Sequence, residues 1–214
     1  MITLPCYPGS FFSNHFKMRN LLAHVRCDVR QGGNREKVLL LQEVQSDWAQ
    51  QARREFQRSD GGRQRIAAPP FLAEWPALVL KLVLLHAAHG GMDAVAWTRG
   101  AHQVHRYNGL GEDGLRELYD RTLPREANRM LTPFRIGSGS VEVYVPENFG
   151  IRRIEEGYEV RTAGGRRLGV APTMVEARDL LPDGAHEWLW SVHGVRLDEA
   201  MRQSIRQRGF MAWG

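Results

Sequence analysis

The sequence is poor in cysteine, in lysine and in long apolar runs. Its 214 residues include two cysteines, Cys6 and Cys27, too few for the disulfide framework of a small secreted domain. No signal-peptide pattern is recognisable, so we expect a cytoplasmic protein. The longest apolar run, 77–88, contains Lys81 and His86 and is shorter than the ~20 residues that a membrane-spanning helix needs. We therefore expect no membrane partner.

Lysine scarcity leaves arginine as the main cation. Of the 29 basic residues only Lys17, Lys37 and Lys81 are lysines, which leaves 26 arginines, and the formal net charge is +5. The planar guanidinium fork suits phosphates and carboxylates, so this bias fits nucleic acid or a phosphorylated ligand. The codon usage of a GC-rich genome explains the same bias without any function. The composition alone leaves both interpretations open.

Alternation of apolar and polar residues predicts a β-hairpin near the N-terminus. Residues 21–29 alternate with period two, 38–44 form a buried strand, and Gly32-Gly33 supplies the turn between them. The apolar helix expected after Pro76 ends at Gly90-Gly91 and is followed by a short strand, 94–97. Strand, helix and strand predict a right-handed crossover with 94–97 parallel to 38–44. We expect Leu78, Leu82 and Leu85 to lie in the core.

The remaining pattern predicts an α/β (α+β) fold with a mixed, mostly antiparallel sheet. A helix over 114–130 contains Pro124, which should kink or split it. A strand is expected at 141–145. Four segments follow from these patterns: an irregular lead-in (1–20), an α/β core domain (21–145), a small ββα insert (146–186), and a final strand and helix that return to the core (187–214).

Polar residues follow the two strands that we expect to be parallel. Ligands of open α/β sheets collect beyond the carboxyl ends of such strands. Glu43 and Asp47 are the predicted catalytic acids, because two close carboxylates raise the pKa of one of them into the range of a general base. The predicted substrate- or anion-binding residues are Gln45, Trp48, Arg99, Gln103, Arg106 and Tyr107.

A purely structural interpretation explains the same residues. Asp47 would then interact only with a helix dipole, Trp48 would be a core aromatic, Glu43 would pair with Lys81, and Tyr107 would simply pack. No metal is expected, because the histidine pairs at 86/89 and 102/105 lack a third ligand. Nucleophile elbow, Walker loop, zinc ribbon and dinucleotide fingerprint are all missing from the sequence.

Local sequence resembles a domain found in large polyvalent proteins of phages, prophages and conjugative elements. Its most specific motif is Glu-Val-Gln-Ser-Asp-Trp at 43–48. Further matching pieces are Leu-Ala-His-Val-Arg at 22–26, Ala-Pro-Pro-Phe at 68–71, Trp-Pro at 75–76, Ala-Trp-Thr-Arg-Gly at 96–100, Arg-Tyr at 106–107 and Met-Arg-Gln-Ser-Ile at 201–205. The resemblance implies an origin in mobile elements and a bacterial host cell, and it names no reaction.

The order of elements is similar to the central half of a GNAT acyltransferase. That resemblance implies acetyl-CoA as cofactor and places Tyr119 where the family has a general-acid tyrosine. The pyrophosphate loop of the family is matched only in part by 58–63, where Arg63 replaces a small residue.

The leading hypothesis is therefore a mobile-element enzyme-like domain, a GNAT-like acyl or group transferase that acts on a small or nucleotide-bearing substrate. The alternative is a non-catalytic module that binds nucleic acid or a host protein and is delivered with phage or plasmid DNA.

Overall fold

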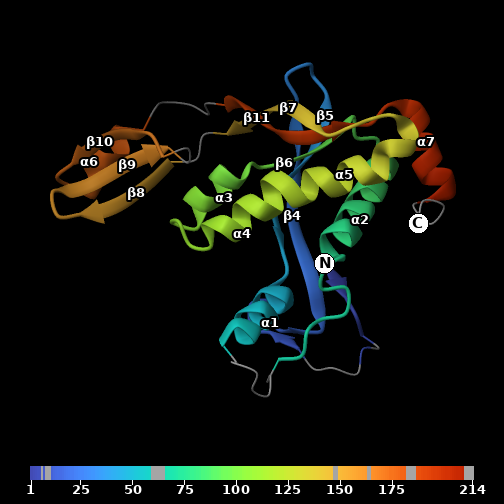
Figure 1. The fold of residues 1–214 in the computed structure, drawn as a ribbon. Coiled ribbons are helices and arrows are strands. Elements are labelled where there is room, and N and C mark those ends of the chain that lie inside the picture. The colour runs from blue at the N-terminus through green and yellow to red at the C-terminus, as the bar shows by residue number, and fades with distance from the viewer. Residues whose placement is uncertain are drawn as a thin grey trace.

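A computed structural model describes residues 1–5, 7, 11–58, 66–146, 149–162, 165–181 and 187–209. Its main feature is a six-stranded sheet in the order β1-β4-β5-β6-β11-β7, with a separate three-stranded sheet to one side (Figure 1). One neighbouring pair in the large sheet is parallel and the others are antiparallel. The predicted α+β class with a mixed, mostly antiparallel sheet is confirmed.

The predicted hairpin and crossover are present. β4 (Leu21–Gln31) pairs antiparallel with β5 (Lys37–Gln45). Helix α2 (Trp75–His89) then leads to β6 (Ala94–Trp97), which runs parallel to β5. Pro at the start of α2 lacks an N–H that the first turn would leave unpaired, so it fits there.

The buried side of α2 differs from the prediction. Leu82 is 51% exposed, whereas Leu78 and Leu85 are partly buried. Val83 and Leu84 lie in the core instead. A helix that is apolar on almost every side carries no pattern that marks which side is buried. The elements packed around α2 determine that side: β4, β6, α5 (Leu123–Leu131) and α7 (Glu199–Arg208).

Two strands from the C-terminal half complete the large sheet. β11 (Glu187–Arg196) lies between β6 and β7 (Gly139–Pro146) and is antiparallel to both. The first twenty residues, predicted to be irregular, contribute β1 (Ile2–Thr3) to the opposite edge of this sheet and a two-stranded unit, β2 (Phe12–Ser13) and β3 (Met18–Arg19). Such two-residue strands lie below what a periodic pattern can reveal.

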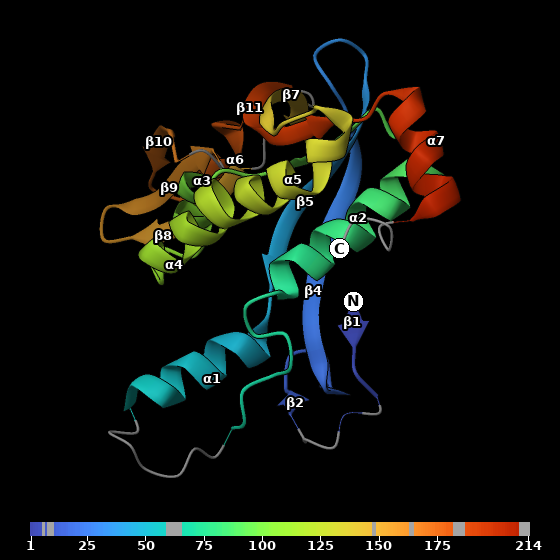
Figure 2. The ribbon, with the colours of Figure 1, turned by 45° about the vertical axis from the view of Figure 1, so that its right-hand side comes forward.

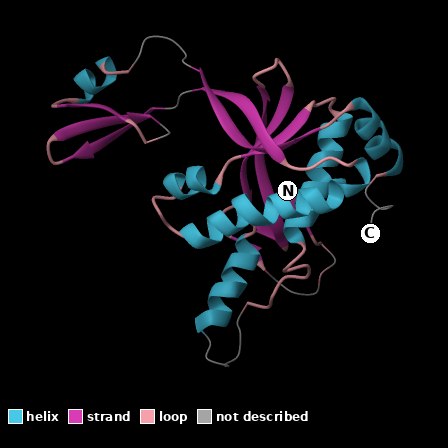
Figure 3. Ribbon diagram, turned by 45° about the horizontal axis from the view of Figure 1, so that its top comes forward, coloured by secondary structure: helices cyan, strands magenta, loops and turns pink. Residues whose placement is uncertain are grey.

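The large sheet carries a separate core on each face. Helices α2, α5 and α7 lie on one face, as Figures 2 and 3 show, and cover Leu39, Leu41 and Trp97. On the other face Val38 and Leu40 pack against residues of β6, β7 and β11. The sheet curls there, because Gly32 at the hairpin turn bridges to Val143 of β7. The second face is therefore concave.

Cys27 lies on the mainly apolar side of the alternating strand 21–29, which predicts that it faces the core, but it is exposed. It shares a strand side with Val25, which packs on the helix-side core, and with Val29, which is 49% exposed. The alternation therefore predicts the correct side of the strand for Cys27. Cys27 is exposed because the helices do not extend to this end of β4.

The helical segment after β6 is broken upstream of Pro124. It consists of α3 (Gly100–Arg106), α4 (Glu112–Arg116), a π-helical turn (Glu117–Thr122) and then α5. Pro124 occupies the first turn of α5, directly after the π-helical turn that splits the predicted helix. A 3-10 turn, Thr132–Phe134, follows. In the π-helical turn the carbonyl of Tyr119 accepts a hydrogen bond from Trp97 Nε1 at 3.1 Å.

The small sheet has three strands rather than the two predicted. β8 (Phe149–Ile154), β9 (Gly157–Thr162) and β10 (Arg167–Ala171) are antiparallel, and α6 (Met174–Asp179) packs on one face of them. The sequence of β8 carries two adjacent arginines, which obscured its strand pattern.

Candidate functional site

A β-bulge in β5 determines which way its polar end faces. Arg26 pairs with Glu43 and Cys27 pairs with Leu41, so Gln42 is an extra residue. Before the bulge Leu41 faces the helices, and after it Val44 does. Glu43 therefore lies on the concave face, beside Arg26 of β4. A regular strand would have turned Glu43 into the helix-side core.

Two side chains hold the bulge in place. Tyr119 is 1% exposed, and its hydroxyl accepts from Val44 N at 2.7 Å and lies 3.2 Å from Val44 O. Gln103 Nε2 donates to Gln42 O at 2.7 Å and to Thr98 Oγ1 at 2.6 Å. Gln103 thus joins the end of β5 to the first residue after β6.

Glu43 is the centre of the polar cluster. Its side chain is 14% exposed and accepts a hydrogen bond from the Tyr107 hydroxyl at 2.5 Å. Tyr107 bonds to Oε1, whereas Arg106 Nη2, at 3.4 Å, and Arg26 Nη2, at 3.8 Å, approach the other carboxylate oxygen, Oε2. Burial, followed by the bond to Glu43, raises the pKa of Tyr107 above its ordinary value. Tyr107 therefore keeps its proton at neutral pH.

The second predicted acid, Asp47, is connected to Glu43 through the side chains of Gln45 and Tyr107. Asp47 begins α1 (Asp47–Arg58) and accepts from Gln45 Nε2 at 2.5 Å and from Ser13 Oγ at 3.3 Å. Gln45 Oε1 lies 3.4 Å from the Tyr107 hydroxyl. His24 Nε2 lies 4.0 Å from Glu43, and burial lowers the pKa of His24 although Asp47 and Glu43 oppose the shift.

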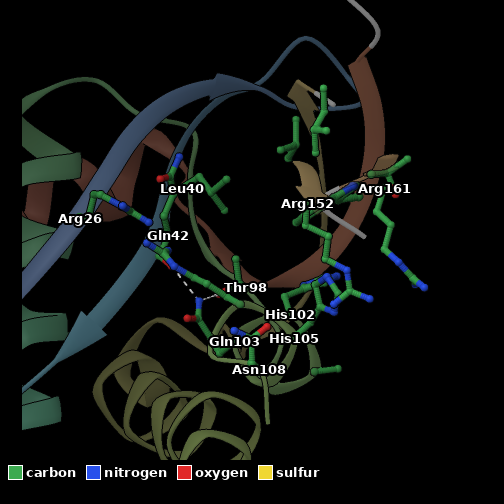
Figure 4. Close-up of a pocket in the computed structure, with 16 residues that line it drawn as sticks. Arg26, Leu40, Gln42, Thr98, His102, Gln103, His105, Asn108, Arg152 and Arg161 are labelled. Carbon is green, nitrogen blue, oxygen red and sulfur yellow. Dashed lines mark hydrogen bonds between the residues drawn. The ribbon is translucent and has the colours of Figure 1, made fainter. Parts of the chain in front are cut away.

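A pocket of about 810 Å³ opens beside this cluster (Figure 4). One wall is formed by β4, β5 and α3 and the other by the small sheet, whose Gly165 turn lies against the ring of His105. The floor continues the concave apolar core and is lined by Leu40, Val145 and Trp190. Trp190 stacks on His102 with 4.5 Å between ring centroids.

The polar lining of the pocket is cationic. Its charged or titratable side chains are Arg26, His102, His105, Arg106, Arg152 and Arg161. Among the lining residues that the structure describes there is no carboxylate. Such a lining, above an apolar floor, suits a ligand that combines an anionic group with an apolar or aromatic part.

The structure brings together Glu43, Gln45, Asp47, Arg106 and Tyr107, with Gln103 beneath them, and leaves three predicted residues outside. Arg99 Nε donates to Ser191 O at 3.0 Å. Trp48 is 1% exposed and its Nε1 donates to Ala67 O at 2.8 Å. Tyr119 is buried, with its hydroxyl bonded to Val44. Glu43 and Tyr107 are not among the described lining residues of the pocket, and Glu43 meets it through Arg26 and Arg106, which are.

Sequence reasoning missed several residues of this site. Arg26 and His24 were visible on the polar side of the first strand but were not connected with Glu43, because the bulge sets that register. Arg152, Arg161 and Trp190 come from segments distant in sequence, and no local signal links them with β5.

The gap between β5 and β6 does not fit coenzyme A. The resemblance to GNAT acyltransferases implies that the strand before the pyrophosphate loop, here β5, binds the pantetheine arm. Here Gln103 and Arg106 both approach the Gln42 carbonyl in that gap, with Arg106 Nη1 at 3.4 Å. Most of the loop at 58–63 lies outside the described residues, and α1 separates β5 from α2.

Comparison with known proteins finds no matching family model, no similar curated protein and no similar solved structure. Within the described ranges, no group of three or more metal-ligating side chains is placed to hold a metal ion. No helix in the same ranges is long and apolar enough to span a membrane.

Proposed function

We propose that this chain is an enzyme domain of mobile-element origin that performs a group transfer on a small, nucleotide-bearing substrate. The observation that supports it is the cationic pocket with an apolar floor beside Glu43. Arg26 and Arg106 hold the anionic part of the substrate, and Leu40 and Trp190 contact its base.

Glu43 has two roles in this proposal. Its carboxylate orients Arg26 and Arg106, because both guanidinium groups approach it. It is also the general base: a substrate hydroxyl or amine that displaces the Tyr107 hydroxyl gives its proton to the carboxylate as it forms a bond to the transferred group. The bond between that group and the nucleotide phosphate breaks at the same time, and the phosphate leaves with the electron pair, its charge neutralised by Arg26 and Arg106. Tyr107 stays protonated and donates a hydrogen bond to the substrate oxygen. Group transfer, rather than acyl transfer from coenzyme A, is the reaction class that this geometry supports.

Calorimetric titration with ATP, AMP and inorganic pyrophosphate tests the binding step. We expect Arg106→Gln to weaken nucleotide binding about tenfold, as expected for the loss of one charged hydrogen bond. The matched control is Arg125→Gln, because Arg125 is an exposed arginine on α5, outside the pocket lining, that pairs with its neighbour Glu126. Equal loss in both variants would show that general charge, and not the pocket, binds the nucleotide.

Product analysis tests the catalytic step. Mass spectrometry of a nucleotide and acceptor mixture should show a new product with the wild-type chain and none with Glu43→Gln. Nucleotide binding without a product from any acceptor class would reject the enzyme proposal and leave a binding pocket.

A further inference from the structure

One face of the small sheet carries a cluster of arginines around a buried glutamate. Arg152 lies directly opposite Glu159 on the neighbouring strand, and Arg167 lies opposite Arg161. Cross-strand partners and residues two apart point to the same side of a sheet, so these four side chains share one face. We call it the arginine face. The opposite face packs on α6 through Val160.

Glu159 holds the arginines in position. Its side chain is 4% exposed and lies 2.7 Å from Arg152 Nε, 2.8 Å from Arg161 and 3.4 Å from Arg167 Nε. The hydrogen bond from Arg161 is the main reason why the pKa of Glu159 falls to about 2. The carboxylate is therefore charged at neutral pH, and three guanidinium groups surround one negative charge.

The arginine face is open to solvent. The side chains of Arg152, Arg161 and Arg167 are 67%, 39% and 51% exposed. Acidic residues near it, Glu155 and Glu156, are in the turn between β8 and β9 at one end. The face is thus an exposed, preorganised set of cations with a net positive charge.

We propose that the arginine face binds the phosphate backbone of double-stranded DNA. Exposed guanidinium groups on neighbouring strands ~4.8 Å apart suit successive phosphates of a nucleic-acid backbone. Single strands are bound largely by stacking on aromatic side chains. No described residue on this face is aromatic, and Tyr158 packs on the other face. Duplex is therefore favoured.

Fluorescence anisotropy with a duplex of about 20 base pairs tests this. Three phosphate contacts predict that binding weakens about 40-fold between about 50 and about 200 mM salt. Arg167→Gln should reduce this ratio to about 12-fold and weaken binding at every salt concentration. Arg129→Gln on α5 is the matched control, because Arg129 is 63% exposed and also pairs with a glutamate. We expect it to bind duplex like the wild type.

The outcomes separate this proposal from the nucleotide pocket. Arg152 and Arg161 of the arginine face also line the pocket, but Arg167 does not, and Arg106 lines it and is not on the small sheet. Arg167→Gln should impair duplex binding alone, and Arg106→Gln should impair nucleotide binding alone. Equal duplex loss in Arg129→Gln and Arg167→Gln would overturn the proposed location. Tighter binding of single-stranded than of duplex DNA, or no measurable duplex binding, would overturn the proposal and leave the pocket unaffected.

Discussion

Replacing Glu43 with Gln removes one negative charge and keeps the size of the side chain. The two ion pairs that are lost involve Arg106 and Arg26, whose side chains are 35% and 52% exposed. Solvent screens such pairs, so each contributes about 0.5 kcal/mol. The Tyr107 hydroxyl exchanges a charged acceptor for a neutral one, which weakens that bond by about 1 kcal/mol. We expect Glu43→Gln to lower the free energy of unfolding by about 2 kcal/mol.

For a chain of this length that loss lowers Tm by about 4–8 °C, which differential scanning calorimetry measures. Glu36→Gln is the matched control, because Glu36 is 18% exposed and pairs with the half-exposed Arg196 at 2.8 Å, away from the pocket. We expect a smaller loss there and unchanged nucleotide binding. A loss above about 4 kcal/mol for Glu43→Gln would mark a fully buried structural network and refute the argument that the arginines remain available to a ligand. A loss below about 0.5 kcal/mol would show that the cluster contacts do not form in solution.

Three further measurements test the fold and the cluster. Urea denaturation should show that Leu84→Ala costs about 2–5 kcal/mol and Leu82→Ala less than about 0.5 kcal/mol, because only Leu84 is buried. Tyr119→Phe should cost about 1–3 kcal/mol in the same assay, since it leaves the buried N–H of Val44 without its acceptor. Burial lowers the pKa of His24 below 6.5, so neutral His24 stabilises the fold above that pH and this contribution is lost as pH falls through its lowered pKa. A His24→Gln variant should show a weaker dependence of Tm on pH below 6.5, and an unchanged profile would contradict the burial of this histidine.

The fold followed from the sequence wherever a pattern was local. The hairpin, the crossover helix and the parallel strand 94–97 depend on short-range periodicity and on turn residues, and each was predicted. The inner side of α2 was not, because a helix that is apolar almost all round has no polar side to mark its outside. The strand β8 was not predicted, because a small sheet that packs on one short helix needs few apolar residues and so gives a weak pattern of alternation.

The candidate site was predictable only along the chain segments that carry it. Glu43 and Gln45 lie at the end of one of two adjacent parallel strands, Arg106 and Tyr107 follow the other, and that rule placed them together. The side of the sheet to which Glu43 points, however, depends on a one-residue bulge at Gln42, and the periodicity of the sequence does not reveal that bulge. The rule also placed Arg99 in the cluster, whereas its guanidinium turns to the carbonyl of Ser191 on β11. The order of the strands predicts which residues lie near one another. The direction of each side chain also depends on the register in which the strands pair.

Two mostly buried glutamates solve the same physical problem at different places in the fold. Guanidinium groups that gather at one surface repel one another, and each would turn outward if nothing held it. Glu43 lies beneath Arg26 and Arg106, and Glu159 beneath three arginines of the small sheet. One carboxylate offsets part of the repulsion, fixes the orientation of several arginines and leaves a net positive charge at the surface. A count of 26 arginines is explained by codon usage as well as by function, whereas this arrangement requires acids at particular registers. The arrangement, rather than the composition, supports binding of phosphates.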